Sequence, residues 1–250
     1  MKFSNKKKLR LDEFLVEKEY FENVDTAKRN IMAGNVIINN VKLLKAGEMI
    51  SLNKVKEVKI KSKGIPYVSR GGLKLEKAIK EFDIDFKDKI VLDIGASTGG
   101  FTDCALQNGA KFVYAVDVGT NQLDWKLRTN QNIKSIENRH INDLEKEEID
   151  NKIPDIIVMD ISFISIKKVF SGIQKFMNED TVAIFLIKPQ FEAQKENIDK
   201  GIVKDTEIHK EIIADIKNYV ETFNVNMLSV VESPIRGTKG NIEYLALLKK

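Results

Sequence analysis

Three charged residues stand where apolar runs of this sequence end, and their types suit proton transfer. Asp160 closes the run DIIVMD, Lys188 closes VAIFLIK, and Glu243 lies in the otherwise apolar stretch IEYLALLK. Pro189 forces an extended backbone at Lys188 and blocks continuation into helix, so the amine should project beyond its strand. A strand-end salt bridge explains each residue about as well when it is taken singly. Together they predict a Lys–Asp–Glu cluster.

A glycine-rich turn, DIGASTGGFTD, begins at Asp93 and has the composition of a small-molecule site. Such a turn lets a ligand approach the backbone closely and offers the amides of a helix N-terminus. The spacing Gly95-x-x-x-Gly99-Gly100 differs from the G-x-G-x-x-G of dinucleotide sites. Asp117, at the end of the next strand, is placed to bind two ribose hydroxyls, and Asp93 suits a positively charged sulfonium. These residues favour S-adenosylmethionine over NAD or FAD as cofactor.

Further cofactor contacts are expected from the same turn and from two other strand ends. Ser97 and Phe101 belong to the turn, Asp160 ends the fourth expected strand, and Asp143 follows the third. Acidic or amide side chains at the place of Asp143 often reach an adenine amine. A helix N-cap explains Asp143 nearly as well.

Alternating strand and helix patterns must position these residues. Apolar stretches with near-continuous hydrophobic character are typical of a sheet that is covered on both faces. Helical stretches separate them near residues 100–108, 165–177 and 205–223. We predict an α/β fold with a seven-stranded, doubly wound, mainly parallel sheet, which binds ligands beyond the carboxyl ends of its central strands. The expected strands are residues 89–95, 111–118, 133–137, 155–162, 181–188, 225–232 and 242–249.

Charge divides the 250-residue chain into a small basic part and a larger, near-neutral part. Residues 1–66 hold 15 Lys and Arg against 8 Asp and Glu, whereas residues 67–250 hold 26 against 29. This split favours a polyanion-binding appendage on a working domain over a merely solvated, lysine-rich surface. We expect one domain at 1–63, a linker at 64–67 and a second domain at 68–250.

Composition argues against several classes of protein. Basic residues 1–10 are not followed by the apolar segment of a signal peptide, and the longest apolar run, Val182–Ile187, is too short to cross a bilayer. The single cysteine, Cys104, and two dispersed histidines leave no disulfide and no zinc-type cluster. We therefore expect a cytoplasmic protein with no metal and no membrane partner.

The basic part predicts a compact helix-and-strand domain. The spacing of Leu11, Phe14 and Leu15 is helical, and Asn23 can cap a second helix. The inner face of that second helix would carry Ala27, Ile31 and Met32. Short strands are expected at 36–38, 49–52 and 55–60.

This part resembles the S4 RNA-binding domain in RLDEFL at 10–15, AKRNIMAGNVIINN at 27–40 and LLKAGEMI at 43–50. The resemblance implies that Lys28 and Arg29, with Arg10, contact RNA phosphates. The Ser-Arg pair that usually opens the second helix in this family is Asn23-Val24 here, so the cap is kept but the arginine is absent. The resemblance thus implies weak RNA binding by this module alone.

Motifs along nearly the whole chain are similar to those of the TlyA family of ribosomal RNA 2′-O-methyltransferases, whose catalytic domain belongs to the FtsJ-like group. The resemblance implies S-adenosylmethionine as donor, ribosomal RNA or a ribosomal subunit as partner, and a cytidine ribose as target. The motifs are YVSRGGLKL at 67–75, LDIGASTGGFTD at 92–103, AVDVG at 115–119, MDISFIS at 159–165, LIKPQFE at 186–192 and GNIEYL at 240–245.

The same resemblance implies a catalytic tetrad of Lys74, Asp160, Lys188 and Glu243, with Arg70 contacting RNA. Lys188 would accept the proton of the ribose 2′-hydroxyl or orient that hydroxyl, and Asp160 would orient Lys188. Lys74 and Glu243 would position the ribose, because positioning two reactants can supply much of the acceleration. Lys74 rests on the resemblance alone, since its neighbours indicate an ordinary helix surface.

Rival functions belong to other classes. A base methyltransferase would explain the faint likeness of MDISF to an Asp-Pro-Pro-Tyr motif, but both prolines are missing. Cys104 could be the nucleophile of a carbon-5 cytosine methylase, although its place on a helix suits a packed residue. A non-enzymatic RNA- or ribosome-binding factor would not bind S-adenosylmethionine. Some TlyA relatives carry a haemolysin label, but the sequence shows neither an export signal nor a spanning segment.

Overall fold

The computed structural model describes residues 8–21, 23–61 and 65–250. The chain forms two compact units, Met1–Pro66 and Tyr67–Lys250. The expected linker at 64–67 begins at Gly64, which lies outside the described residues.

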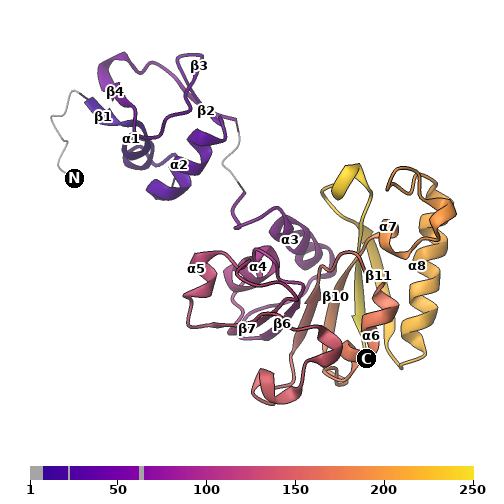
Figure 1. The fold of residues 1–250 in the computed structure, drawn as a ribbon. Coiled ribbons are helices and arrows are strands. Elements are labelled where there is room, and N and C mark those ends of the chain that lie inside the picture. The colour runs from indigo at the N-terminus through magenta and orange to yellow at the C-terminus, as the bar shows by residue number, and fades with distance from the viewer. Residues whose placement is uncertain (1–7, 22, 62–64) are drawn as a thin grey trace. The chain divides into compact units, whose positions relative to one another are not determined.

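Seven strands form the sheet of the larger unit, in the order β11-β12-β10-β9-β6-β7-β8 (Figure 1). The strands from β6 to β10 run parallel, and β12 is antiparallel to both of its neighbours. The predicted seven-stranded, mainly parallel sheet is therefore confirmed. The strands are β6 (Ile90–Ile94), β7 (Phe112–Val116), β8 (Ile133–Ile136), β9 (Ile156–Met159), β10 (Val182–Ile187), β11 (Asn226–Glu232) and β12 (Tyr244–Lys249).

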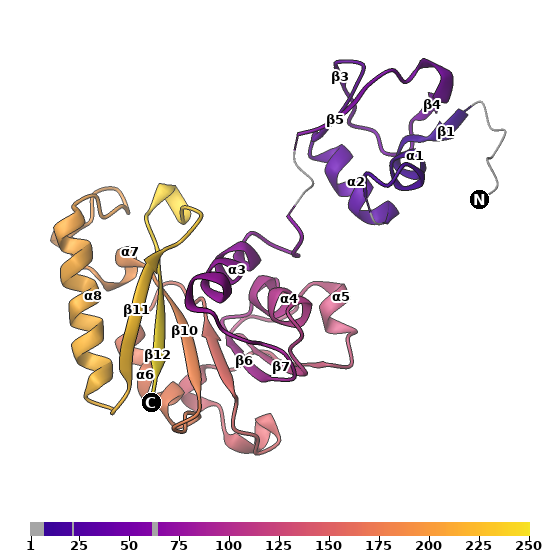
Figure 2. The same cartoon turned by 180° about the vertical axis from the view of Figure 1, so that it is seen from behind.

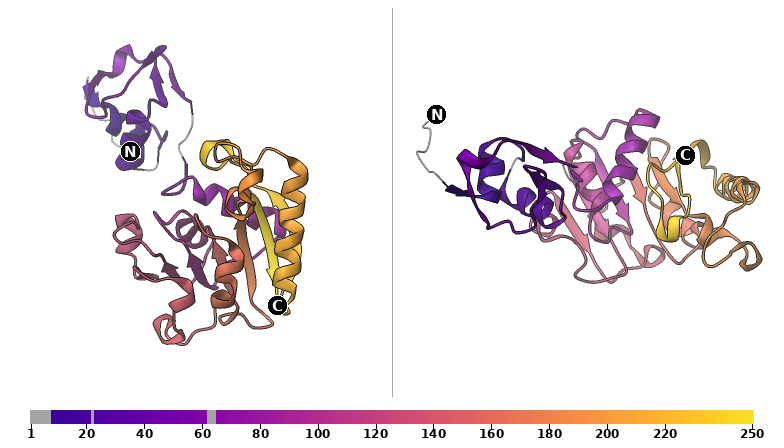
Figure 3. Two further views of the ribbon diagram at one scale, coloured as in Figure 1. Left: turned by 45° about the vertical axis from the view of Figure 1, so that its right-hand side comes forward. Right: turned by 90° about the horizontal axis from the view of Figure 1, so that it is seen from above.

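Helices cover both faces of this sheet (Figures 1 and 2). Because successive strand residues point to opposite faces, Val91 packs with one group of helices and Leu92 with the other. Figure 3 shows α8 running alongside β11. One group is α3 (Gly71–Phe82) and α4 (Gly100–Gln107), and the other is α6 (Ile166–Gln174) and α8 (Thr206–Glu221). Two one-turn helices, α5 (Trp125–Arg128) and α7 (Pro189–Glu192), lie in the connections.

The order of the strands creates a crevice at the carboxyl ends of β6 and β9. From β6 the chain moves outward to β7 and β8, and then returns to β9 on the other side of β6. Ligands of doubly wound sheets bind where the direction of winding reverses. The glycine turn follows β6 and Asp160 follows β9, so both lie at this point.

The smaller unit has its own buried core, and short strands and two helices surround it. β1 pairs antiparallel with β4, and β2 lies between β3 and β5. A two-residue Asn39-Asn40 turn joins β2 to β3, with positive φ at both residues, as hairpin turns of this length require. The elements are β1 (Lys8–Arg10), α1 (Leu11–Glu17), α2 (Val24–Met32), β2 (Val36–Ile38), β3 (Val41–Lys42), β4 (Met49–Ser51) and β5 (Val58–Ile60).

The details of this unit correct two predictions. Asn23 caps α2 as expected, since its Oδ1 accepts a hydrogen bond from the Thr26 amide at 2.9 Å. The placement of Met32 was wrong, because its side chain is 71% exposed whereas Ile31 is fully buried. Adjacent helix residues point about 100° apart, so only one of the two can face the core. The predicted strands at 49–52 and 55–60 were too long, because a 3₁₀ turn occupies Leu52–Lys54.

Candidate active site

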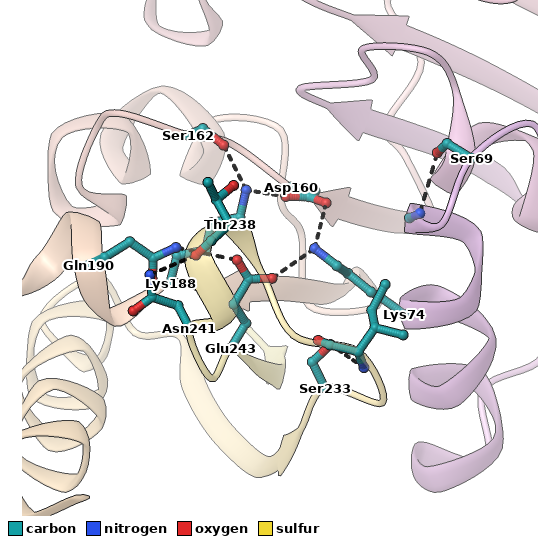
Figure 4. Close-up of polar contacts among 12 residues, drawn as sticks. Ser69, Lys74, Asp160, Ser162, Lys188, Gln190, Ser233, Thr238, Asn241 and Glu243 are labelled. Carbon is teal, nitrogen blue, oxygen red and sulfur yellow. Dashed lines mark hydrogen bonds and ion pairs between the residues drawn. The ribbon is translucent and has the colours of Figure 1, made fainter. Parts of the chain in front are cut away.

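Four charged side chains meet at the carboxyl end of the sheet, and the two lysines reach Asp160 from opposite sides (Figure 4). Lys74 Nζ lies 2.8 Å from Glu243 Oε2 and 3.4 Å from Asp160 Oδ2. Lys188 Nζ lies 2.5 Å from Asp160 Oδ1. Asp160 is thus shared by both lysines, whereas the ion pair of Glu243 among the described residues is with Lys74.

Burial makes these pairings necessary. Lys74 and Lys188 are each 8% exposed, and Glu243 is buried. Removing a charge from water is costly unless an opposite charge or hydrogen bonds compensate it. Two ammonium groups facing two carboxylates balance the net charge of the cluster.

Strand pairing places Lys188 beside Glu243. β10 pairs antiparallel with β12, with Ile187 opposite Tyr244, so the next residue on β10 faces the residue before β12. Lys188 has the predicted extended backbone, with φ −116° and ψ 98°. The expectation that Pro189 blocks a following helix was wrong, because α7 begins at Pro189 itself. Proline is tolerated at the first helical position, where its missing N–H has no helical partner.

Gly100 brings Lys74 towards the cluster by letting α3 approach the glycine turn, and Gly72 makes room for Tyr67 against α3. A Cβ on Gly100 would lie 2.3 Å from Ser69 Oγ and 2.9 Å from the backbone nitrogen of Gly72. A Cβ on Gly72 would lie 2.2 Å from the ring of Tyr67. Lys77, one turn further along α3, is paired instead with Glu81 at 3.5 Å and stays partly exposed.

A cavity of about 400 Å³ lies over the cluster and is lined by Lys74, Asp160 and Lys188. The glycine turn forms another wall, through Gly95 to Thr98, Gly100 and Phe101. Gly95 has φ +81°, and a Cβ there would lie 2.8 Å from the carbonyl oxygen of Asp160. Only glycine therefore fits where the ends of β6 and β9 meet. The volume is that of a small-molecule site.

Asp117 and Asp93 occupy different positions relative to this cavity. Asp117 accepts hydrogen bonds from the amides of Ser97 and Gly119, each at 2.7 Å, and lines a small hollow that shares Ser97 with the cavity. Asp93 is fully buried beneath the turn and accepts a hydrogen bond from Thr102 Oγ1 at 2.6 Å. It lies outside the cavity lining, so the expected direct contact of Asp93 with the cofactor has no geometric support. Gly99, with φ +93°, packs against Leu127 rather than the cavity.

Asp143 is exposed and belongs to the 3₁₀ turn Ile141–Asp143. The alternative that it caps a helix was wrong, because His140 occupies the cap position and its Nδ1 accepts from the Asn142 amide at 3.2 Å. Asp143 also lies outside the linings of the cavity and the hollow.

The basic residues expected to contact RNA are divided between the two units. Arg70 lines the cavity. The other three lie in the smaller unit, where Arg10 pairs with Asp12 at 2.7 Å and Lys28 with Asp25 at 3.5 Å.

Three residues of the site were missed by sequence reasoning. Ser162 Oγ accepts a hydrogen bond from Lys188 Nζ at 2.7 Å, and Gln190 Nε2 donates to Glu243 Oε1 at 3.4 Å. Phe163, next to Ser162 but outside the cavity lining, is 91% exposed and its ring lies tilted against that of Phe191, with ring centroids 5.1 Å apart. Their signal in the sequence is adjacency, since they follow Asp160 and Lys188 by two or three residues.

Comparison with known proteins shows which family the chain belongs to. Residues 67–250 match the FtsJ-like methyltransferase family. The chain is 45% identical to Hemolysin A of Brachyspira hyodysenteriae, over 95% of this chain and 98% of that protein. It is 32% identical to the 16S/23S rRNA (cytidine-2′-O)-methyltransferase TlyA of Mycobacterium tuberculosis, over 97% of this chain and 90% of that one.

A solved structure from Streptococcus thermophilus, provisionally described as a hemolysin, has the same fold with a TM-score of 0.75. It is 42% identical in sequence and covers 97% of this chain and 88% of that chain. The fold is that of a Rossmann-like methyltransferase. The chain belongs to the FtsJ-like methyltransferase family, in the group that includes TlyA and Hemolysin A.

Proposed function

We propose that this protein transfers a methyl group from S-adenosylmethionine to the 2′-hydroxyl of a ribose in ribosomal RNA, with cytidine as the target nucleotide. The observation that carries the proposal is the buried Lys74–Asp160–Lys188–Glu243 cluster at the cavity. A ribosomal RNA substrate implies a cytoplasmic location. In the described residues, no helix has the length and apolar character to cross a membrane.

The cavity fits the donor. The backbone of Gly95, Ala96 and Ser97 lines it without bulky side chains, which suits a nucleoside lying against the turn. Asp117 uses one lone pair on each oxygen for backbone amides, so its carboxylate keeps lone pairs for two ribose hydroxyls. Bound there, S-adenosylmethionine supplies the methyl group as an already activated sulfonium.

The cluster would handle the proton of the ribose hydroxyl. As the oxygen–methyl bond forms and the methyl–sulfur bond breaks, the 2′-hydroxyl must lose its proton. Lys188, an ammonium group in its pair with Asp160, would first release a proton to solvent, and its amine would then accept the proton of the 2′-hydroxyl. Its amine is oriented on two sides, by Asp160 at 2.5 Å and by Ser162 at 2.7 Å. Fixed orientation of this kind is what makes general-base and proximity catalysis effective.

Lys74 would have a different role. It lies between two carboxylates and forms ion pairs with both Glu243 and Asp160. A charged ammonium group suits hydrogen bonding to the ribose oxygen and stabilises negative charge that develops there. Glu243 would hold Lys74 in place, with Gln190 supporting it from the other oxygen.

Substitution of Lys188 tests whether this residue takes part in methyl transfer. Lys188→Ala should lower methyl transfer to in-vitro-transcribed ribosomal RNA by at least about a hundredfold, the size of a general-base contribution. Binding of S-adenosylmethionine and of RNA should change little. Lys77→Ala, which removes a partly exposed lysine of α3, is the control. Full activity in the Lys188 variant would refute its role.

The position of the transferred methyl group in the RNA shows which atom of the substrate is methylated. RNA labelled with a methyl-tritiated donor is digested to nucleosides and separated. We expect the label in 2′-O-methylcytidine. Label in a methylated base would contradict the proposal, and failure of the protein to bind the donor in a calorimeter would favour a non-enzymatic RNA-binding factor.

A further inference from the structure

The connection from β11 to Glu243, residues 233–241, is built to hold one position over the cavity. Ser233 Oγ donates to the Ile235 carbonyl at 2.9 Å, and the Gly237 amide donates to the Asn241 carbonyl at 2.8 Å. Asn241 is buried, and its Nδ2 donates to the Thr238 carbonyl at 2.9 Å (Figure 4). These bonds leave the backbone on either side of Arg236 little freedom.

Glycine at position 237 brings this connection down onto the cluster. A Cβ there would lie 2.0 Å from Glu243 Oε1, so the backbone rests directly against that carboxylate. Ile235, Arg236, Gly237 and Thr238 accordingly line the same cavity as Lys74 and Lys188.

Arg236 is held there by a weak partner. Its Nη2 lies 3.3 Å from Glu232 Oε1, and both side chains are about half exposed. Exposed pairs of this kind contribute little free energy. The guanidinium group can therefore exchange Glu232 for a phosphate, which it binds with two parallel hydrogen bonds.

The charges around the cavity divide into a balanced floor and a basic rim. On the floor, Lys74 and Lys188 are compensated by Asp160 and Glu243. On the rim, Arg70 is exposed and makes no ion pair among the described residues, and Arg236 makes only its half-exposed one. The compensated charges of the floor suit a neutral ribose. The positive charges of the rim suit the phosphate groups attached to that ribose.

We propose that Arg236 binds a backbone phosphate next to the methylated ribose, while Arg70 binds a second phosphate from the wall formed by α3. The two arginines come from different elements, which suits an internal nucleotide with a phosphate on each side rather than a free nucleoside. This inference rests on the proposed function, because it takes the reacting group to be a ribose of an RNA strand.

The test compares RNA binding by the full chain and its variants across salt concentrations, using in-vitro-transcribed ribosomal RNA as the probe. Each phosphate contact contributes nearly one unit to the slope of log affinity against log salt. Between about 50 and 200 mM salt, wild-type affinity should therefore fall about threefold further than that of Arg236→Ala. Arg236→Lys keeps the charge and should keep the wild-type slope.

Lys217→Ala is the matched control, because Lys217 forms an i,i+4 pair with Glu221 at similar exposure on α8. Its slope and its donor affinity should both equal those of the wild type. An unchanged slope in Arg236→Ala would overturn the inference. Because binding is the readout, this result is separate from failure of the proposed function, which would appear as absence of ribose methylation by the wild type.

Discussion

At the scale of single residues, Asp93 is a buried carboxylate that lies beneath the cavity without lining it. It lies fully buried under the glycine turn, and its Oδ1 has no hydrogen-bond partner among the described residues. Burial raises the pKa of Asp93 to about 7, because a desolvated carboxylate is costly, although the hydrogen bond from Thr102 opposes this. Asp93 thus supports the turn from below, partly as a neutral acid.

This burial predicts a pH dependence of stability. The pKa of the Asp93 carboxyl rises from 3.8, its ordinary value in an unfolded chain, to about 7 in the folded protein. Between these values the folded state holds a proton that the unfolded state has released, so the free energy of unfolding falls as pH rises. The decrease is at most about 4 kcal/mol and is complete above pH 7 or so. Melting temperatures measured from about pH 4.5 to 8 should decline less in Asp93→Asn than in the wild type. Parallel curves would contradict the prediction.

At the scale of elements, the close approach of α3 to α4 positions the first lysine. Gly100 opens α4, and Gly72 lies in the first turn of α3, two residues before Lys74. Since a side chain at Gly100 would meet Ser69 Oγ and the backbone of Gly72, Gly100 sets the distance between the two helices, whereas Gly72 makes room for the ring of Tyr67. Lys74 on α3 then meets Glu243, which directly precedes β12.

Gly100→Ala should separate these helices. The added methyl group would overlap Ser69 Oγ and the backbone of Gly72, and overpacking of this kind costs about 1–3 kcal/mol. We expect a lower melting temperature and a larger decrease in methyl transfer than in donor affinity, because Lys74 moves. Gly71→Ala is the control for stability, since its nearest neighbour would be a side-chain oxygen at 3.3 Å. Equal melting temperatures for the two variants would argue against the packing explanation.

At the scale of the whole molecule, we propose that the chain separates RNA recognition from chemistry. Each unit has its own buried core, so a substitution on the surface of the smaller unit should leave the methyltransferase site intact. We propose that the smaller unit, whose sequence resembles an S4 domain, binds RNA. Lys28 is partly exposed on α2, with only a weak pair to Asp25.

Lys28→Ala combined with Arg29→Ala tests this division of labour. We expect weaker binding to ribosomal RNA and a salt slope smaller by about one unit for each phosphate that the variant no longer binds. Donor affinity and melting temperature should stay near the wild-type values, because both side chains lie on the surface of α2. Unchanged RNA affinity would indicate that the smaller unit has another role.

Much of the architecture followed from local patterns. Apolar stretches, interrupted by polar residues in β8 and β11, predicted all seven strands of the sheet, and the period of two within them explains why Val91 and Leu92 enter different cores. The prediction of which side chains are buried was less accurate at Met32, because adjacent positions of a helix face different ways. The same limit applied to Pro189, because proline both ends extended segments and opens helices.

The sequence by itself determined the alternation of strands and helices, the glycine turn and the strand-end positions of Asp160, Lys188 and Glu243, because hydrophobic periodicity and turn chemistry act over a few residues. Only the tertiary structure decided which charges meet. Lys74 and Lys77 have similar local surroundings, yet one is buried against Glu243, 169 residues away, and the other pairs with Glu81 on the surface. Asp93 likewise lies beneath the turn rather than in the cavity. Contacts of this kind depend on strand order and on the close approach of helices, which involve residues far apart in the chain.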